Sequence, residues 1–224
     1  MKFGIVVFPG SNCERDCHDA TTLVLGQPTE YLWHDETDLN GADCIILPGG
    51  FSYGDYLRSG AIARFSPIMA EVQRHADQGG LVIGICNGFQ VLTESGLLPG
   101  ALRRNSGLRF QCDRVAMTVE TTDTPFTNAY QPGQTITLPI ANGDGSYYAD
   151  PEVLQQLEDN QQVVFRYAED VNGSLNRIAG ICNAKRNVLG MMPHPERNLW
   201  PSEIWTGEGR GVFDSILSAS TVGV

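Results

Sequence analysis

The sequence predicts an α/β protein, a single layered domain with a mostly parallel central sheet and helices on both faces. In the N-terminal half, short apolar runs alternate with helical patterns, which is typical of parallel strands buried on both faces. After Leu108, strand patterns follow one another with few helices between them, which predicts additional strands in the C-terminal half. No linker, repeat or low-complexity segment interrupts the 224 residues, so we expect one domain over residues 1–224.

The N-terminal half is predicted to contain four strands and three helices. The strands are expected at Phe3–Phe8, Thr29–Trp33, Ala42–Leu47 and Leu81–Ile85. Asn12 is a candidate N-cap for a first helix, whose apolar face would include Ala20, Leu23 and Val24. Three- and four-residue apolar steps through Phe65 predict a second helix over Ala61–Ala76. A third helix is expected from Asn87 to Ser95.

The C-terminal half is predicted to add strands to the same layered domain. Strands are expected at Val115–Val119, Thr135–Ile140, Val163–Tyr167, Ile178–Asn183 and Val188–Met192. Helices are expected at Glu152–Asp159 and Val212–Ala219.

Composition excludes several classes of protein. With 15 basic and 26 acidic residues, the formal charge is −11, which argues against nucleic acid as a main ligand because phosphate binding needs a basic surface. No apolar stretch has the length of a membrane span, and the N-terminus lacks the features of a signal peptide. We therefore expect a cytoplasmic protein whose six cysteines are reduced and mostly act as small buried hydrophobes.

Cys86 is the strongest candidate for a catalytic nucleophile. Gly84 and Gly88 flank it between a predicted strand and a predicted helix, which is the nucleophile-elbow pattern with sulfur in place of oxygen. Such a tight turn needs small neighbours, and a helix N-terminus favours thiolate over thiol. The alternative is a buried cysteine at a strand end with two turn glycines, but the strand–elbow–helix context favours a nucleophile.

His194 and Glu196 are the candidate base and acid. They follow an apolar run within a segment stiffened by two prolines. In an extended segment residues two apart point the same way, so Glu196 is placed to orient the imidazole as the third member of a triad. The alternative is a proline-rich surface turn. The order nucleophile, histidine, acid differs from that of the serine α/β-hydrolases, where the acid comes before the histidine.

Pro48-Gly49-Gly50 is a candidate oxyanion turn. It ends a predicted central strand, and open α/β sheets place their sites at the carboxyl edge of the strands. The backbone N–H groups of Gly50 and Asn87 are therefore predicted to hold a developing oxyanion. The alternative is an ordinary glycine turn.

Together these motifs resemble a known family. Gly84–Gln90, Pro48–Gly50 and His194–Glu196 are similar to the motifs of class I (triad) glutamine amidotransferases. Longer matches at Pro9–Asp16, Pro48–Arg58 and Gly190–Arg197 resemble the glutaminase subunits of phosphoribosylformylglycinamidine synthases, which act in purine biosynthesis. The resemblance extends over nearly the whole chain.

The resemblance implies a glutaminase that works within a heteromeric complex. Cys86 would form a thioester with glutamine and release ammonia to an ATP-dependent synthetase subunit, with a small bridging subunit as a further partner. It implies no cofactor or metal in this chain, with ATP and Mg on the synthetase, and no nucleic-acid or membrane partner. Consistent with that, the chain contains no phosphate-binding G-x-x-x-x-G-K-[ST] loop.

Further residues are assigned to the substrate and the partner. Glutamine binding is predicted for Gln90, Asn105, Ser106 and Arg109. Partner contact and gating are predicted for Tyr53, Tyr56 and Arg58, residue types enriched at interface hot spots. The chain departs from the family at Asn142 and Asp144, where the family often carries histidine and glutamate.

Three other interpretations remain open at this point. The chain could be a cysteine hydrolase or chaperone of the same fold group, which would not need the His194–Glu196 segment. A non-catalytic interaction protein is a second alternative, against which the complete triad argues. Cys13 and Cys17 have the spacing C-x3-C, but no second pair of ligands supports a zinc site.

Overall fold

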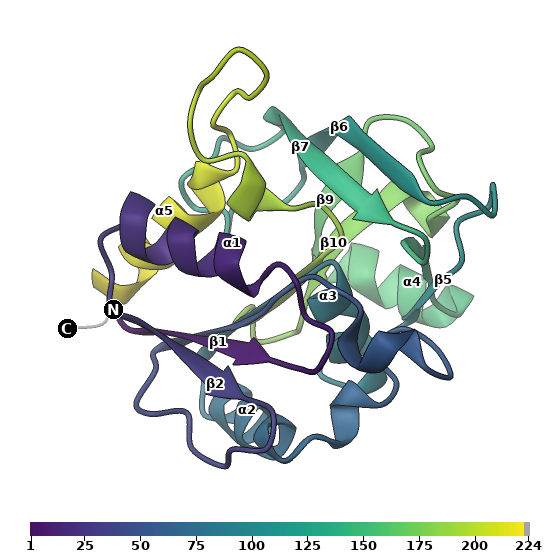
Figure 1. The fold of residues 1–224 in the computed structure, drawn as a ribbon. Coiled ribbons are helices and arrows are strands. Elements are labelled where there is room, and N and C mark those ends of the chain that lie inside the picture. Colours follow the sequence, from purple (N-terminus) through teal and green to yellow (C-terminus); the bar gives the residue numbers. More distant parts are fainter. Residues whose placement is uncertain (222–224) are drawn as a thin grey trace.

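A nine-stranded sheet organises the computed structural model, which describes residues 1–221 (Figure 1). The strand order is β2-β1-β3-β4-β11-β10-β9-β6-β7, and β5 and β8 form a separate two-stranded sheet. The strands are β1 (Phe3–Val7), β2 (Thr29–Trp33), β3 (Cys44–Leu47), β4 (Leu81–Ile85), β5 (Ala101–Arg103), β6 (Gln111–Val119), β7 (Thr135–Asn142), β8 (Ser146–Tyr148), β9 (Val163–Tyr167), β10 (Ile178–Cys182) and β11 (Val188–Met191).

The sheet has a parallel half and an antiparallel half. Strands β2, β1, β3, β4 and β11 pair in parallel, whereas β10, β9, β6 and β7 continue the sheet in antiparallel pairs. The predicted α/β class is confirmed, as are the strands added in the C-terminal half. Because β3, β4 and β11 are parallel neighbours, their carboxyl ends meet at one edge, and the three segments that follow them carry the candidate catalytic motifs.

Helices cover both faces of the parallel half. They are α1 (Glu14–Asp19), α2 (Pro67–Asp77), α3 (Asn87–Glu94), α4 (Pro151–Asp159) and α5 (Arg210–Thr221). In Figure 1, α1 and α5 lie on one side of β1 and β2, and α2 lies on the other. The central strands β3 and β11 are buried along their whole length, as expected for parallel strands covered on both faces. Within the described residues no helix combines the length and hydropathy that a membrane span requires.

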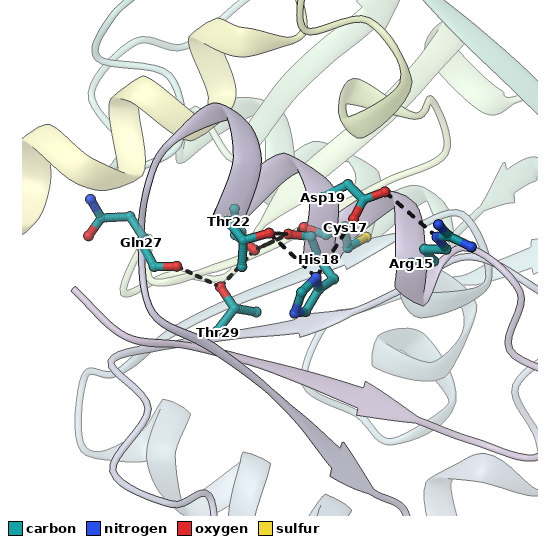
Figure 2. A network of polar contacts seen from close by, with 8 residues as sticks. Arg15, Cys17, His18, Asp19, Thr22, Gln27 and Thr29 are labelled. Carbon is teal, nitrogen blue, oxygen red and sulfur yellow. Dashed lines mark hydrogen bonds and ion pairs between the residues drawn. The ribbon is translucent and has the colours of Figure 1, made fainter.

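The first helix differs from its prediction at both ends. Its N-cap is Cys13, because the Asn12 side chain instead accepts a hydrogen bond from the Cys13 thiol at 3.2 Å. Beyond Asp19 the helix widens into a π-helical turn, Ala20–Val24, where the Thr22 hydroxyl donates to the His18 carbonyl at 2.6 Å (Figure 2). The change of period turns Leu23 outward, and its side chain is 73% exposed rather than part of the apolar face.

The second predicted helix is two elements. A short 3-10 helix covers Ala63–Phe65, and α2 begins at Pro67. Proline disfavours the helical conformation of the residue before it, so Ser66 is extended and separates the two segments. Phe65 therefore lies outside the helical face and is 73% exposed. Strands β5 and β8 were not predicted, since three residues are too short for a periodic pattern.

Candidate active site

Cys86 occupies a strained turn between β4 and α3. Its φ of 52° and ψ of −105° lie in a region that costs a non-glycine residue about 1–3 kcal/mol. Gly88 has to be glycine, because a Cβ there would lie 1.9 Å from the Leu47 carbonyl oxygen. A Cβ on Gly84 would lie 2.6 Å from the Gly88 backbone. The turn therefore has the geometry of a nucleophile elbow, with glycines at the two positions where the chains approach most closely.

His194 and Glu196 form a buried pair directly after β11. His194 Nδ1 lies 2.7 Å from Glu196 Oε1, and the two side chains are only 2% and 0% exposed. Burial opposes the charged form of the imidazole, but the charge of Glu196, and then that of Cys86, outweigh it and raise the pKa of His194 well above its usual range. The pair therefore favours an imidazolium whose orientation is set by Glu196.

The other ring nitrogen of His194 is left for proton exchange. Nε2 is buried and makes no hydrogen bond within the described residues, while the Cys86 thiol donates to the Ala141 carbonyl oxygen at 3.6 Å. The charge of Cys86 acts on the imidazole, so the thiol and the ring are close to one another, although the structure has no hydrogen bond between them. Such an arrangement is common before substrate binds. Nε2 is therefore the candidate atom of His194 for proton exchange with Cys86.

The oxyanion turn is held against the loop that follows β1. Phe51 N donates to the Gly10 carbonyl at 2.9 Å, and Gly50 forms an isolated bridge with Ser11. Gly50 has a φ of 144°, and a Cβ there would lie 2.8 Å from Asn12 N, so no other residue fits. Asn87 is the first residue of α3, where amide N–H groups have no partner within the helix.

A hollow of about 200 Å³ opens beside the Cys86 side chain. We call it the active-site hollow; its lining residues are Gly50, Phe51, Asp55, Ser59, Cys86, Gln90, Arg104, Leu108, Arg109, Phe110, Ala141, Asn142, Gly143 and Asp144. Of the residues predicted to bind glutamine, Gln90 and Arg109 lie in this lining, whereas Asn105 and Ser106 do not.

The predicted substrate residues differ in what they contact. Gln90 is buried and donates from Nε2 to the Asp144 carbonyl at 2.7 Å, so it fixes one wall of the hollow. Asn105 is fully buried; its Nδ2 donates to the Asn142 carbonyl and its Oδ1 accepts from Gly145 N, both at 2.9 Å. Asn105 therefore supports the loop that lines the hollow, and Ser106 is exposed outside it.

The departure from the family at Asn142 and Asp144 lies in this wall. Asp144 Oδ2 accepts a hydrogen bond from Ser59 at 3.0 Å, and Arg104 Nε lies 3.7 Å from its other oxygen. The amide of Asn142 is buried without a hydrogen-bond partner in the described structure. Asp144 thus presents a carboxylate at the hollow.

The three residues predicted to contact a partner are engaged to different degrees. Tyr53 bonds through its hydroxyl to His34 Nδ1 and to Ser66 Oγ, both at 2.8 Å, so it packs on its own domain. Arg58 forms a bidentate ion pair with Glu94, in which Nε and Nη2 donate to the two carboxylate oxygens at 2.5 and 2.6 Å. Tyr56, by contrast, is 70% exposed and open to a partner.

Two residues near the site had no assigned role. Asp55 lines the hollow; burial raises its pKa, as does the charge of Asp144, while a contact with Ser59 lowers it. Cys13 is buried, and its sulfur, a nitrogen of His194 and an oxygen of Glu196 all lie within 4.8 Å of one another. Both residues lie in family motifs that the triad chemistry itself does not need, which was the one signal available in the sequence.

Comparison with known proteins identifies the family. The model of the CobB/CobQ-like glutamine amidotransferase domain matches residues 1–211. The chain belongs to this family. The glutamine amidotransferase class expected from the motifs is thereby confirmed, and the alternative of a cysteine hydrolase or chaperone of the same fold group loses its support. Within the described residues, the potential ligands near Cys13 are His194 and Glu196, not Cys17.

Members of this family with high identity share one name. A protein named phosphoribosylformylglycinamidine synthase subunit PurQ from a Nostoc species is 66% identical over 218 residues, covering 97% of each chain. A protein of the same name from Gloeobacter violaceus is 58% identical over 229 residues, covering 98% of each.

Solved structures agree with the fold of this glutamine amidotransferase. A chain in the structure of PurLQS from Thermotoga maritima is 46% identical, covers 98% of each chain and superposes with a TM-score of 0.90. The glutaminase domain of CTPS from Trypanosoma brucei, at 13% identity and a TM-score of 0.61, shows the fold alone.

Proposed function

We propose that this chain is the glutaminase subunit of a phosphoribosylformylglycinamidine synthase, with Cys86 as nucleophile, His194 as acid and base, and Glu196 as the residue that orients it. The observation that carries the proposal is the buried His194–Glu196 pair, whose imidazole is close enough to Cys86 for the charge of Cys86 to raise its pKa, while Cys86 itself lines a hollow of about 200 Å³. High identity to proteins named PurQ supports the subunit assignment.

The chemistry follows from the positions of three groups. The Cys86 thiolate attacks the side-chain amide carbon of glutamine, and the N–H groups of Gly50 and Asn87 stabilise the oxyanion. His194 Nε2–H then protonates the leaving nitrogen, the C–N bond breaks, and ammonia departs. Water, deprotonated by His194, hydrolyses the thioester and releases glutamate while the thiol is restored.

The hollow carries charges suited to an amino acid. Asp55 and Asp144 present two carboxylates, and within residues 1–221 no ion pair engages Asp55. The α-ammonium group of glutamine fits between these carboxylates, and Arg109, on the same lining, suits its α-carboxylate. Gln90 holds the Asp144 main chain in place for this contact.

Ammonia leaves the site for a partner subunit in this proposal. The synthetase subunit binds ATP and Mg and consumes the ammonia, and a small bridging subunit completes the complex. The relatives' name and the PurLQS title support these partners. One glutamine amidotransferase domain covers the chain in a cytoplasmic enzyme, to which the free state of its six thiols is suited; residues 222–224 lie outside the described structure.

In this proposal, binding of the partner changes the conformation of the oxyanion turn. The segment after Gly50 contains Tyr53, Asp55 and Leu57 with φ values of 53°, 53° and 70°, and each such residue costs about 1–3 kcal/mol. Exposed Tyr56 lies within this strained stretch. A partner that binds Tyr56 would therefore shift the conformation of this strained segment, which lies only a few residues from the oxyanion turn.

The experiment is steady-state glutamate release by the purified chain, alone and then with the synthetase, the small subunit, Mg-ATP and formylglycinamide ribonucleotide. We expect slow release alone and at least about a tenfold increase in the complex, because the partner completes the oxyanion turn. No glutamate in either state would reject the glutaminase. Equal rates in both states would reject the gating and leave the triad in place.

Neutralising Asp55 should weaken glutamine binding. In Asp55→Asn we expect KM for glutamine to rise about tenfold or more with a smaller change in kcat, since a charge-assisted contact to the ammonium group is lost from both ground and transition states. Asp150→Asn is the matched control, because Asp150 is exposed and makes no side-chain capping hydrogen bond at the N-cap of α4. An unchanged KM in Asp55→Asn would remove Asp55 from the substrate site.

A further inference from the structure

Cys13 connects the oxyanion turn with the catalytic histidine. Its backbone N–H donates to the Gly49 carbonyl at 3.2 Å, so the N-terminal end of α1 is bonded to the turn itself. Its side chain lies near the proposed base and acid, since the sulfur, a His194 nitrogen and a Glu196 oxygen all lie within 4.8 Å of one another. The residue is 2% exposed. One buried residue therefore contacts both halves of the catalytic apparatus.

Cys13 and His194 pack so closely against Gly49 that no side chain would fit at that position. A Cβ built on Gly49 would lie 2.8 Å from His194 Cε1 and 2.9 Å from Cys13 Sγ, both shorter than real contacts. The edge of the imidazole and the sulfur therefore pack against the same face of Gly49. Any shift of the sulfur changes the room available to the ring, because a packed interior transmits displacement rather than absorbing it.

Arg197 binds the sulfur of Cys13 and is itself bound by Asp16. Arg197 Nη2 donates to Cys13 Sγ at 3.1 Å, and its Nε donates to Asp16 Oδ2 at 2.8 Å. Asp16 lies on α1, and Arg197 follows Glu196 directly. The guanidinium thus links α1 to the segment that carries the histidine and the acid, with the sulfur between the guanidinium and the imidazole.

We propose that Cys13 is a positioning residue for glutamine hydrolysis, which holds the His194 imidazole in register with the Gly49–Gly50 oxyanion turn through its sulfur and its bond to Arg197. The inference is tied to the proposed function, since it assigns a role within the same site. Sulfur suits the position because it is large enough to fill the space beside Gly49 and accepts a weak hydrogen bond without forming a second strong ion pair next to Glu196.

The test compares Cys13→Ala and Cys13→Ser with the unaltered chain, each assembled in the synthase complex. For Cys13→Ala we expect kcat for glutamate release to fall about tenfold to a hundredfold, since a misplacement of the order of 1 Å has that effect. KM for glutamine should stay within about twofold, because the residues that bind the substrate lie elsewhere in the hollow. Cys13→Ser should recover part of kcat, since its hydroxyl still accepts a hydrogen bond from Arg197.

The pH profile separates this role from a merely structural one. The charged or titratable groups around the imidazole are Glu196, Cys86 and Cys13, with Arg197 and Asp16 behind the sulfur. Burial lowers the pKa of His194. The charges of Glu196 and Cys86 raise it, and the contact with Cys13 adds to the increase. Without the sulfur, the limb of the kcat profile that reports His194 should move to lower pH.

Two further variants, Cys44→Ala and Arg197→Lys, serve as controls. Cys44→Ala removes a buried cysteine from β3, away from the site, and should lower stability without changing kcat or the pH profile. If Cys13→Ala does not fold, Arg197→Lys should give the same loss of kcat, because lysine lacks the rigid fork from which the guanidinium donates to Asp16 through Nε and to Cys13 through Nη2. Unaltered kcat and pH profile in Cys13→Ala, or in Arg197→Lys in its place, would overturn the proposal. Absence of glutamate release by the unaltered complex would instead reject the proposed function.

Discussion

Replacing Cys86 by alanine or serine is expected to abolish glutamine hydrolysis and leave the fold intact. The fall in kcat should be at least about ten-thousandfold, because no other group can form the thioester and the residual rate comes from binding and the oxyanion turn alone. The strained elbow should relax rather than collapse, since Gly84 and Gly88 remain. Glutamate release, measured in the complex, is the readout. Synthesis from added ammonium salts should continue, because it bypasses the glutaminase.

Chemical labelling provides the control for this prediction. An electrophilic analogue of glutamine should modify Cys86 in the unaltered chain and leave the other five cysteines unmodified, as mapped by peptide mass spectrometry. Iodoacetamide, which needs only access, should also modify Cys112, the one exposed cysteine. Modification of Cys13, Cys17 or Cys182 by the glutamine analogue, with Cys86 unmodified, would contradict the assignment of the nucleophile.

The elements that carry the site were predictable because short-range chemistry determines them. A glycine pair around a cysteine, between an apolar run and a helical pattern, predicts an elbow from steric limits alone, and the contacts of Gly88 with Leu47 show why. The spacing of His194 and Glu196 likewise predicted that their side chains would meet, although the expected extended segment was wrong, since Pro195–Arg197 forms a 3-10 helix. Strands β2, β4 and β9 were predicted with the bounds that they have in the structure.

What could not be predicted depends on contacts between distant segments. Cys13 meets His194 only because the loop after β1 bonds to the turn after β3, and nothing in the local sequence indicates that neighbour. Nor does the local sequence indicate that Asp55 comes close enough to Asp144 for the charge of Asp144 to raise its pKa. Asn105 was assigned to the substrate from its position after the elbow helix, yet its side chain supports the Asn142–Gly145 loop instead.

His194→Ala should be nearly as damaging as the loss of Cys86, and Glu196→Gln should be milder. The base takes part in each proton transfer, while the acid orients it and stabilises its charge, so we expect losses in kcat of about 10⁴ or more and of roughly 10²–10⁴ respectively. Rates of glutamate release in the complex measure both. Turnover near that of the unaltered chain in His194→Ala would mean that another residue serves as base.

The Glu196→Gln variant also carries a prediction about stability and pH. The pKa of His194 is raised in the folded protein, chiefly by Glu196 acting against burial, so protonated His194 favours the folded state. That contribution is fully present below the unfolded imidazole pKa of about 6.5 and is lost as the pH rises through the raised folded value. The free energy of unfolding, from urea titrations at a series of pH values, should therefore differ most between the unaltered chain and Glu196→Gln near pH 6, and the difference should shrink toward alkaline pH. A difference that grows with pH would show that Glu196 does not stabilise the imidazolium.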